Sequence, residues 1–389
     1  MSLVERLTAV GLSPPDYVGP SLGSVLPAAL DAIGYGHVVT GRDAAADRAA
    51  LGIPEAKHVV VVLLDGLGHL QLDARKGHAP FLRSAESGIV SAGFPTTTAT
   101  SLGLFGTGHA AGRTGMVGYS ARNPATRQLA NLISWDGVDH PETWQREPSL
   151  LAAAANAGAS ITTLGKRRFA GSGLTRAVLS GGDFMGAEHL ADRIDGAIAV
   201  SRVPGVSYCY WGELDAAGHK HGWMSDQWVA ALEDADRELR RLAAHLPAGA
   251  ELVVTADHGM VDVTGAPRWD VATEPELARG VALVAGEPRA LHLYLDGSVG
   301  AHELVASWQD RLGKHVVAAP RQEWIDAGIF GPVADHVVDR LGDVVVAMAG
   351  RATVVDSRTQ TEASMALIGV HGSLTHEELL VPLLTVDRS

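Results

Sequence analysis

Three aspartates and three histidines of this sequence stand at the ends of short apolar runs. Runs such as "VVVVLL" and "ELVVTA" read as buried strands, and the polar side chains follow directly. Since the carboxyl ends of parallel strands meet at one edge of a sheet, we expect these side chains to lie close together. Buried charges must be paired or must coordinate metal, so six such groups predict a site for two divalent ions. They are Asp65, Asp215, His219, Asp257, His258 and His371.

Each of these signals is weak when it is taken alone. An Asp-Gly pair after a strand is usually a turn, and a His that follows a Gly is often an ordinary loop residue. Asp257 and His258 are more informative, because two adjacent polar groups before a glycine are an awkward way to end a strand. The prediction therefore depends on the joint pattern.

A run of threonines in "GFPTTTATSLG", residues 93–103, provides a further candidate. Hydroxyl side chains suit the start of a helix whose first amides point at an anion. For Thr96, Thr97 and Thr100 we prefer the interpretation as a capped helix start. A threonine can act as a nucleophile only if its proton is removed, and contact with a metal ion does this without a nearby base.

The elements that must position these groups alternate between strand and helix. Residues 225–246, "SDQWVAALEDADRELRRLAAHL", have apolar side chains three and four apart behind a Ser-Asp start, which predicts a capped amphipathic helix. Strand, helix and strand in sequence indicate parallel crossovers. We therefore expect an α/β fold with a mostly parallel central sheet between layers of helices.

The pattern changes after "DHGMVDVTGAP". Residues 264–364 resemble a compact α+β unit, after which the chain returns with "ALIGVHGSLTHEELLVPLLTV". A chain of 389 residues is also long for one core. We predict a main domain of residues 1–263 and 365–389 that contains the metal site and carries an inserted α+β subdomain of residues 264–364.

Composition excludes several classes of protein. A hydrophobic fraction of 46% with 19% charged residues is typical of a globular protein. The net charge of −13 disfavours nucleic acids and anionic membranes as partners. The single cysteine, Cys209, lies in the apolar run "VSYCYW" and is expected to fill the core. We find no signal peptide and no apolar run of membrane-spanning length, and we expect a cytoplasmic protein.

Five segments together resemble the alkaline phosphatase superfamily, and within it the type I phosphodiesterase/nucleotide pyrophosphatase family, which is similar also to phosphonoacetate hydrolase. They occur in the family's order between residues 58 and 384. The resemblance implies an α/β sheet sandwiched by helices and two divalent ions, usually zinc, although manganese or iron suits the same ligands. The matching segments are "LLDGLG", "FPTTTATSLGLFGTG", "ELDAAGHKHG", "TADHGM" and "GVHGSLTHEELLVPLL".

The resemblance also implies a role for each matching residue. One metal ion would be held by Asp65, Asp257, His258 and the nucleophile Thr98, and the other by Asp215, His219 and His371. The family motif places its nucleophile third after the proline, which selects Thr98. His221 and His376 lie outside the matching positions, and we expect them to be structural or to support the ligands.

The expected activity is hydrolysis of phosphate diesters through a covalent phosphothreonine, with a small phosphate ester, possibly a nucleotide, as substrate. The chain departs from the family after Thr98, where residues 99–102 contain no Asn, and this leaves the substrate class open. Alternatives are a phosphomonoesterase, a phosphonate hydrolase or a non-catalytic metal-binding module. A nucleotide would need a stacking wall and a cation, for which Tyr119, Trp135 and residues 165–169, "GKRRF", are available. We prefer a packed Trp135 and a solvated face at 166–168.

Overall fold

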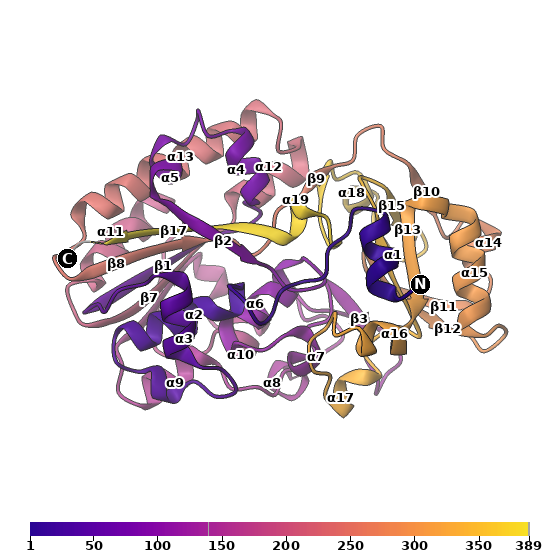
Figure 1. Ribbon diagram of the computed structural model, residues 1–389, viewed down its shortest axis with the longest axis horizontal. Helices are drawn as coiled ribbons and strands as arrows, with labels where there is room; N and C mark the ends of the chain where they lie inside the picture. The colour runs from indigo at the N-terminus through magenta and orange to yellow at the C-terminus, as the bar shows by residue number, and fades with distance from the viewer. Residues whose placement is uncertain (139, 388–389) are drawn as a thin grey trace.

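The computed structural model describes residues 1–138 and 140–387, and a seven-stranded sheet forms the centre of its larger part (Figure 1). Only β17 runs antiparallel to its neighbours, so the sheet is mostly parallel, as predicted. In spatial order the strands are β2 (Glu86–Ser91), β17 (Leu380–Asp387), β8 (Ala250–Thr255), β1 (His58–Leu64), β7 (Gly205–Trp211), β5 (Ile161–Gly165) and β6 (Asp183–Gly186).

Strand β1 lies in the middle of the sheet, and all seven of its residues are buried. Helices cover both faces of a parallel sheet, which is why this strand is a continuous apolar run. Its last pairs join Leu64 to Trp211 of β7 and Leu63 to Thr255 of β8. The three strands therefore end at the same level, and the residues that follow them meet at one edge.

Helices form a layer on each side of this sheet, and Figure 1 shows the two layers above and below it. The lower layer contains α2 (Leu22–Ala32), α3 (Ala44–Leu51), α6 (Thr98–Thr107), α9 (Leu150–Asn156) and α10 (Gly173–Val178). The upper layer contains α4 (His69–Ala74), α5 (Pro80–Ala85), α11 (Leu190–Val200), α12 (Glu213–His221) and α13 (Asp226–His245). The predicted amphipathic helix is α13, and its N-cap Ser225 accepts a hydrogen bond from the Trp228 amide.

A second sheet belongs to the part of the chain that we predicted as an insert. Its four strands are antiparallel and have a separate apolar core, against which α14 (Pro275–Ala278) and α15 (Ala301–Leu312) pack. In spatial order they are β11 (Val281–Glu287), β12 (Ala290–Leu295), β14 (Val344–Met348) and β13 (Val316–Pro320). The orange segments on the right of Figure 1 show this unit, and its exact limits stay a prediction.

Three pairs of short strands lie outside the two larger sheets. They are β3 (Ser120–Arg122) with β4 (Leu129–Asn131), β9 (Val261–Asp262) with β16 (Gly369–Val370), and β10 (Arg268–Asp270) with β15 (Thr353–Val355). The N-terminal helix α1 (Leu3–Ala9) also contacts the second sheet, because Arg6 donates to the Ala318 carbonyl at 3.3 Å.

Two smaller expectations can be checked here. Cys209 is fully buried in β7, and burial raises the pKa of its thiol to about 12, as suits a residue that fills the core. Within the described ranges, the helices are all too short or too polar to span a bilayer.

Candidate active site

The six predicted ligands lie together at the edge where the central strands end. Asp65 follows β1, and Asp257 and His258 follow β8. Helix α12 follows β7 directly. Its residues Asp215, in the first turn, and His219, in the last, are four apart and therefore share one helical face.

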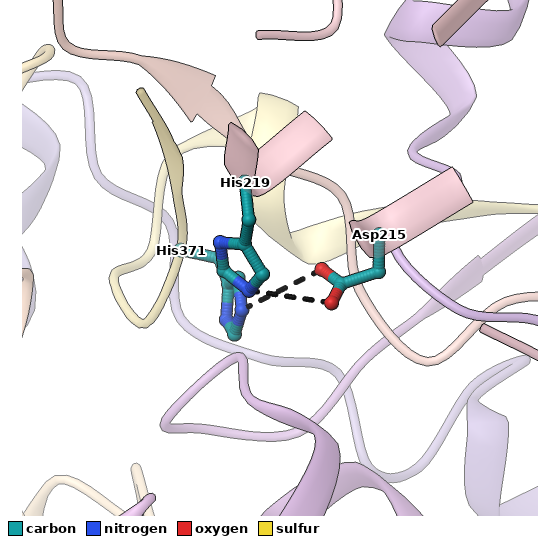
Figure 2. Close-up of side chains that lie close together, drawn as sticks. All are labelled: Asp215, His219 and His371. Carbon is teal, nitrogen blue, oxygen red and sulfur yellow. Dashed lines mark ion pairs between the residues drawn. The ribbon is translucent and has the colours of Figure 1, made fainter. Parts of the chain in front are cut away.

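One group consists of Asp215, His219 and His371, the three side chains expected to hold one ion (Figure 2). His219 Nε2 lies 3.2 Å from Asp215 Oδ2, and His371 Nε2 lies 3.9 Å from Asp215 Oδ1. The ligand atoms of this group are all within 4.8 Å of one another, so a single cation can reach the three side chains.

A second group surrounds His258, whose ring stacks on that of His371 with a centroid distance of 3.7 Å. His258 Nε2 lies 3.5 Å from Asp65 Oδ1 and 3.4 Å from Asp257 Oδ2. Asp215 also lies within reach of Asp65 and His258. The two groups therefore adjoin, with the Asp215 carboxylate between them.

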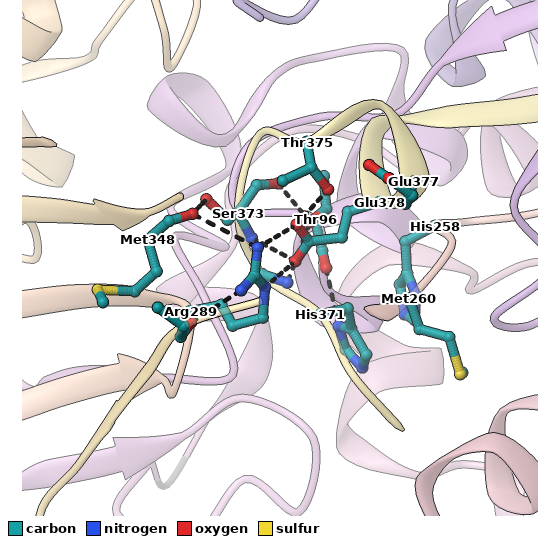
Figure 3. Close-up of polar contacts among 12 residues, drawn as sticks. Thr96, His258, Met260, Arg289, Met348, His371, Ser373, Thr375, Glu377 and Glu378 are labelled. Atoms are coloured by element: carbon teal, nitrogen blue, oxygen red, sulfur yellow. Dashed lines mark hydrogen bonds and ion pairs between the residues drawn. The ribbon is translucent and has the colours of Figure 1, made fainter. Parts of the chain in front are cut away.

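Backbone carbonyls fix the orientation of all three imidazole rings. Nδ1 of His219 donates to the Gly369 carbonyl at 2.7 Å, and Nδ1 of His371 donates to the Thr96 carbonyl at 2.8 Å (Figure 3). Nδ1 of His258 lies 3.1 Å from the Gly259 carbonyl. Because a carbonyl can only accept, Nδ1 carries a proton in each ring, and in the neutral ring the lone pair of Nε2 faces the cluster. Although burial opposes it, the charge of Asp215 raises the pKa of His219 to about 9 in the metal-free protein, so a metal ion must displace the Nε2 proton of this ring.

Each of the three carboxylates retains a buried oxygen that has no hydrogen-bond donor in the described part of the chain. Asp65 Oδ1, Asp215 Oδ1 and Asp257 Oδ2 are buried and accept no hydrogen bond from the described residues. The other oxygen of Asp65 accepts from the Tyr210 hydroxyl. Since buried anions without partners are costly, the arrangement fits divalent metal ions.

The pKa shifts of Asp65 and His371 are those expected of residues in a metal site. Burial, together with the charges of Asp257 and Asp215, raises the pKa of Asp65 well above its ordinary value. Burial lowers the pKa of His371 well below its ordinary value, and the neighbouring His258 and His219 lower it further. His371 is therefore neutral near pH 7, which is the form that binds a metal ion.

Thr98 is the first residue of α6, and its hydroxyl lies 3.3 Å from His258 Nε2. It is partly exposed, whereas Thr96, Thr97 and Thr100 are buried. The hydroxyl of Thr96 donates to the Ser373 carbonyl and that of Thr100 donates to the Met116 carbonyl, both at 2.7 Å. Thr97 occupies the N-cap position, but its side chain makes no capping hydrogen bond, contrary to our expectation of a capped start.

A cavity of about 390 Å³ opens beside Thr98 and the two groups of ligands. Its wall includes Lys166, which pairs with Glu213 at 2.8 Å, and Arg168. Arg167 and Arg168 are exposed, as expected of a solvated face, although Lys166 and Arg168 also line the cavity, and Trp135 is buried as expected. Aromatic side chains that line it are Tyr119, Phe169, Phe184, Tyr208 and Tyr210.

The remaining candidates lie outside the cluster. His221 is the last residue of α12, and His376 Nε2 lies 2.9 Å from the Ser13 hydroxyl. Neither lines a described cavity beside the ligands. Sequence reasoning missed Tyr210, although its hydroxyl within the apolar run "SYCYW" was an available signal. In the sheet, Tyr210 pairs with Leu63 near the end of β1.

Zinc is expected to raise the midpoint of thermal unfolding of metal-free protein by at least about 4 °C. A ligand at a hundred times its Kd stabilises the folded state by about 2.7 kcal/mol, and each kcal/mol shifts the midpoint by roughly 2 °C in a large domain. Asp215→Asn should lose most of this rise, because Asp215 belongs to both groups. The matched control is Asp192→Asn, an exposed carboxylate on α11. An equal rise in all three proteins would place the zinc elsewhere.

Comparisons with known proteins agree with this geometry. A family model described as type I phosphodiesterase / nucleotide pyrophosphatase matches residues 59–374. Murine ectonucleotide pyrophosphatase / phosphodiesterase 5 has a similar structure, with a TM-score of 0.67 and 18% identity over 84% of this chain and 87% of that chain. Its inactive form in complex with AMP has a TM-score of 0.68 and 18% identity, over 85% and 88% of the two chains.

A third similar structure is phosphonoacetate hydrolase from Sinorhizobium meliloti 1021 in complex with phosphonoformate. Its TM-score is 0.64 and its identity is 21%, over 85% of this chain and 90% of that chain. No curated protein matches the chain. At these identities the solved structures show a shared fold, while the family model covers most of the chain.

Proposed function

Since the chain belongs to the type I phosphodiesterase/nucleotide pyrophosphatase family and is thus a phosphoric ester hydrolase, we propose that it cleaves small phosphate diesters through a covalent phosphothreonine at Thr98. The observation that carries this proposal is the position of the Thr98 hydroxyl. It reaches the cavity at the start of α6, 3.3 Å from His258 Nε2, while the hydroxyls of Thr96 and Thr100 are bound to carbonyls elsewhere.

Two groups of side chains would hold two divalent ions, for which zinc is our first choice and manganese or iron fit the same donors. When bound, these ions supply positive charge that lowers the pKa of an attacking hydroxyl or water and balances charge on a departing oxygen. The first group is Asp65, Asp257, His258 and Thr98, and the second is Asp215, His219 and His371.

Thr98 begins the reaction when its Oγ1 attacks phosphorus. The bond to the departing alcohol breaks, and a phosphothreonine forms. Water then attacks the same phosphorus, releases the phosphate monoester and restores the Thr98 hydroxyl. The first amides of α6 have no acceptor within the helix, so they can bind a non-bridging oxygen of the phosphoryl group.

The first cavity suits a nucleotide as the part of the substrate that stays on phosphorus. Its aromatic side chains offer surfaces for stacking a base, and Lys166 and Arg168 offer positive charge to an anion. The similar murine structure in complex with AMP supports the same choice. A phosphonate is the second candidate, because phosphonoacetate hydrolase shares the fold.

The test compares bis-p-nitrophenyl phosphate with p-nitrophenyl phosphate, using protein stripped of metal and reloaded with zinc. We expect kcat/KM to be about 100-fold higher for the diester, because contacts to the second ester group add to transition-state binding. Preference for the monoester would make the protein a phosphatase. Activity on neither would leave a phosphonate hydrolase or a metal-binding module.

A further inference from the structure

A second cavity, of about 320 Å³, lies where the four-stranded sheet meets the main domain. Residues at the end of β11 and the adjoining Tyr119 form part of its wall. The two parts are joined there, because the Ser120 hydroxyl donates to the Gly286 carbonyl and accepts from the Gly286 amide, both at 3.0 Å. The cavity is thus a fixed feature of this junction.

The second cavity also reaches the ligand cluster, and its wall differs from that of the first. His219 and His371 line both cavities, but Thr98 and Asp65 line only the first. In an in-line displacement at phosphorus, the departing group leaves opposite the attacking oxygen. A space that reaches His219 and His371 but is not lined by Thr98 is therefore our candidate for the site of the departing alcohol.

Glu287 is the last residue of β11, and it is an acidic residue of the wall of the second cavity. The side chain is 7% exposed, and Oε2 accepts a hydrogen bond from the Tyr119 amide at 2.9 Å. Oε1 is buried and makes no hydrogen bond of normal geometry among the described residues, and the Thr97 hydroxyl lies near the carboxyl group. Burial raises the pKa of Glu287 to about 8, so near pH 7 the carboxyl group is largely protonated until a cation lies beside it.

Close packing holds this carboxyl group against the segment that follows His371. A Cβ added at Gly372 would lie 2.5 Å from Glu287 Cγ, so a side chain at position 372 would displace it. Glu287 is therefore a built part of the cavity wall, and a ligand in the cavity can supply a donor to its Oε1.

Other polar side chains of the second cavity already have partners. The Asp356 carboxylate forms a two-point pair with Arg358, at 2.6 and 2.7 Å, and the Thr359 hydroxyl donates to the Asp356 carbonyl. Among the described residues that line this cavity, none is a lysine or an arginine. The first cavity differs in the charge of its wall, because the cations Lys166 and Arg168 line it.

We propose that the second cavity binds the departing alcohol and that Glu287 selects alcohols that carry a positive charge over alcohols that carry a negative one. This inference rests on the proposed diesterase function. An ammonium group would give Glu287 Oε1 a charged donor and favour the ionised form of the carboxyl group, whereas a carboxylate or a second phosphate would find no cation among the described residues of this wall. The substrate class is thus a phosphodiester of an amino alcohol, and a pyrophosphate is a poor substrate.

Three diesters of adenosine 5′-monophosphate test the inference, with 2-aminoethanol, ethylene glycol or 3-hydroxypropanoate as the second alcohol. Each releases AMP, which is measured by chromatography with zinc-loaded protein. We expect kcat/KM of the wild-type protein to fall from the amino-alcohol ester to the carboxylate ester. In Glu287→Gln the ratio of these two values should fall at least tenfold, because the amide keeps the shape and removes the charge.

The matched control is Glu303→Gln, an exposed residue of α15 that pairs with Arg279 at 3.1 Å, and it should keep the wild-type ratio. Equal rates on the charged esters in the wild type, or an unchanged ratio in Glu287→Gln, would overturn the selection by charge. Hydrolysis of bis-p-nitrophenyl phosphate without release of AMP from any ester would overturn the assignment of the two cavities. Inactivity on all four diesters would overturn the diesterase function itself.

Discussion

Thr98→Ala is expected to lower kcat on bis-p-nitrophenyl phosphate by at least about 10⁴-fold, because loss of the attacking group removes the covalent route. The fold should be retained, because Thr98 is partly exposed. Among the described residues, its hydroxyl has one hydrogen-bond contact, with His258. Turnover is measured on zinc-loaded protein, with metal content determined for both proteins.

Thr98→Ser is the conservative companion, because it keeps a hydroxyl at the start of α6 and should retain measurable turnover. Acid quenching during turnover should add the mass of the retained phosphoryl ester to the wild-type chain and leave the mass of Thr98→Ala unchanged. Wild-type turnover by a folded, metal-loaded Thr98→Ala protein would rule out the covalent scheme.

Arg289→Ala is expected to destabilise the fold by about 3–5 kcal/mol, because it leaves a buried carboxylate without its partner. Arg289 and Glu378 are both fully buried and form a two-point ion pair, with distances of 2.6 and 2.8 Å (Figure 3). Arg289 lies between β11 and β12 of the second sheet, whereas Glu378 belongs to α19 (His376–Leu379) of the main domain. The pair therefore joins the two parts through their interior.

The same contacts continue to the active site. Glu378 Oε1 accepts from the Ser373 amide at 3.0 Å, and the Ser373 carbonyl accepts from the Thr96 hydroxyl at 2.7 Å. The Thr96 carbonyl in turn orients His371. Loss of Arg289 should thus weaken metal binding as well as stability.

Urea unfolding measures the loss of stability in Arg289→Ala, with Arg279→Ala as the control. Arg279 forms an exposed ion pair with Glu303 on the same sheet's outer helix, and its loss should cost less than about 1 kcal/mol. Replacement of both Arg289 and Glu378 by leucine should recover part of the loss, since no charge is then left unpaired. A cost for Arg289→Ala no larger than that for Arg279→Ala would contradict the proposed junction.

Local patterns were sufficient to predict the central elements. Strand β1 is buried on both faces, so its sequence is continuously apolar and its end is visible at Asp65. Helix α13 has an apolar stripe and a serine cap, and both lie within its own residues. The predicted fold class and family follow from such patterns, because the family motifs occur at the ends of these strands.

What the sequence alone determined is the type of each side chain and the element that carries it: carboxylates and imidazoles after strands, and a threonine run before a helix. The tertiary structure decided how these groups are held. The carbonyls that orient His219 and His371 are 150 and 275 residues away in the chain, and any residue type can supply a carbonyl. Glu287 is the last residue of a strand in "VALVAGEPRA", and in the sequence it resembles a turn residue. Only the packing of the two sheets places it beside Gly372. Contacts between distant segments depend on how whole layers pack, and no local pattern of residues encodes that arrangement.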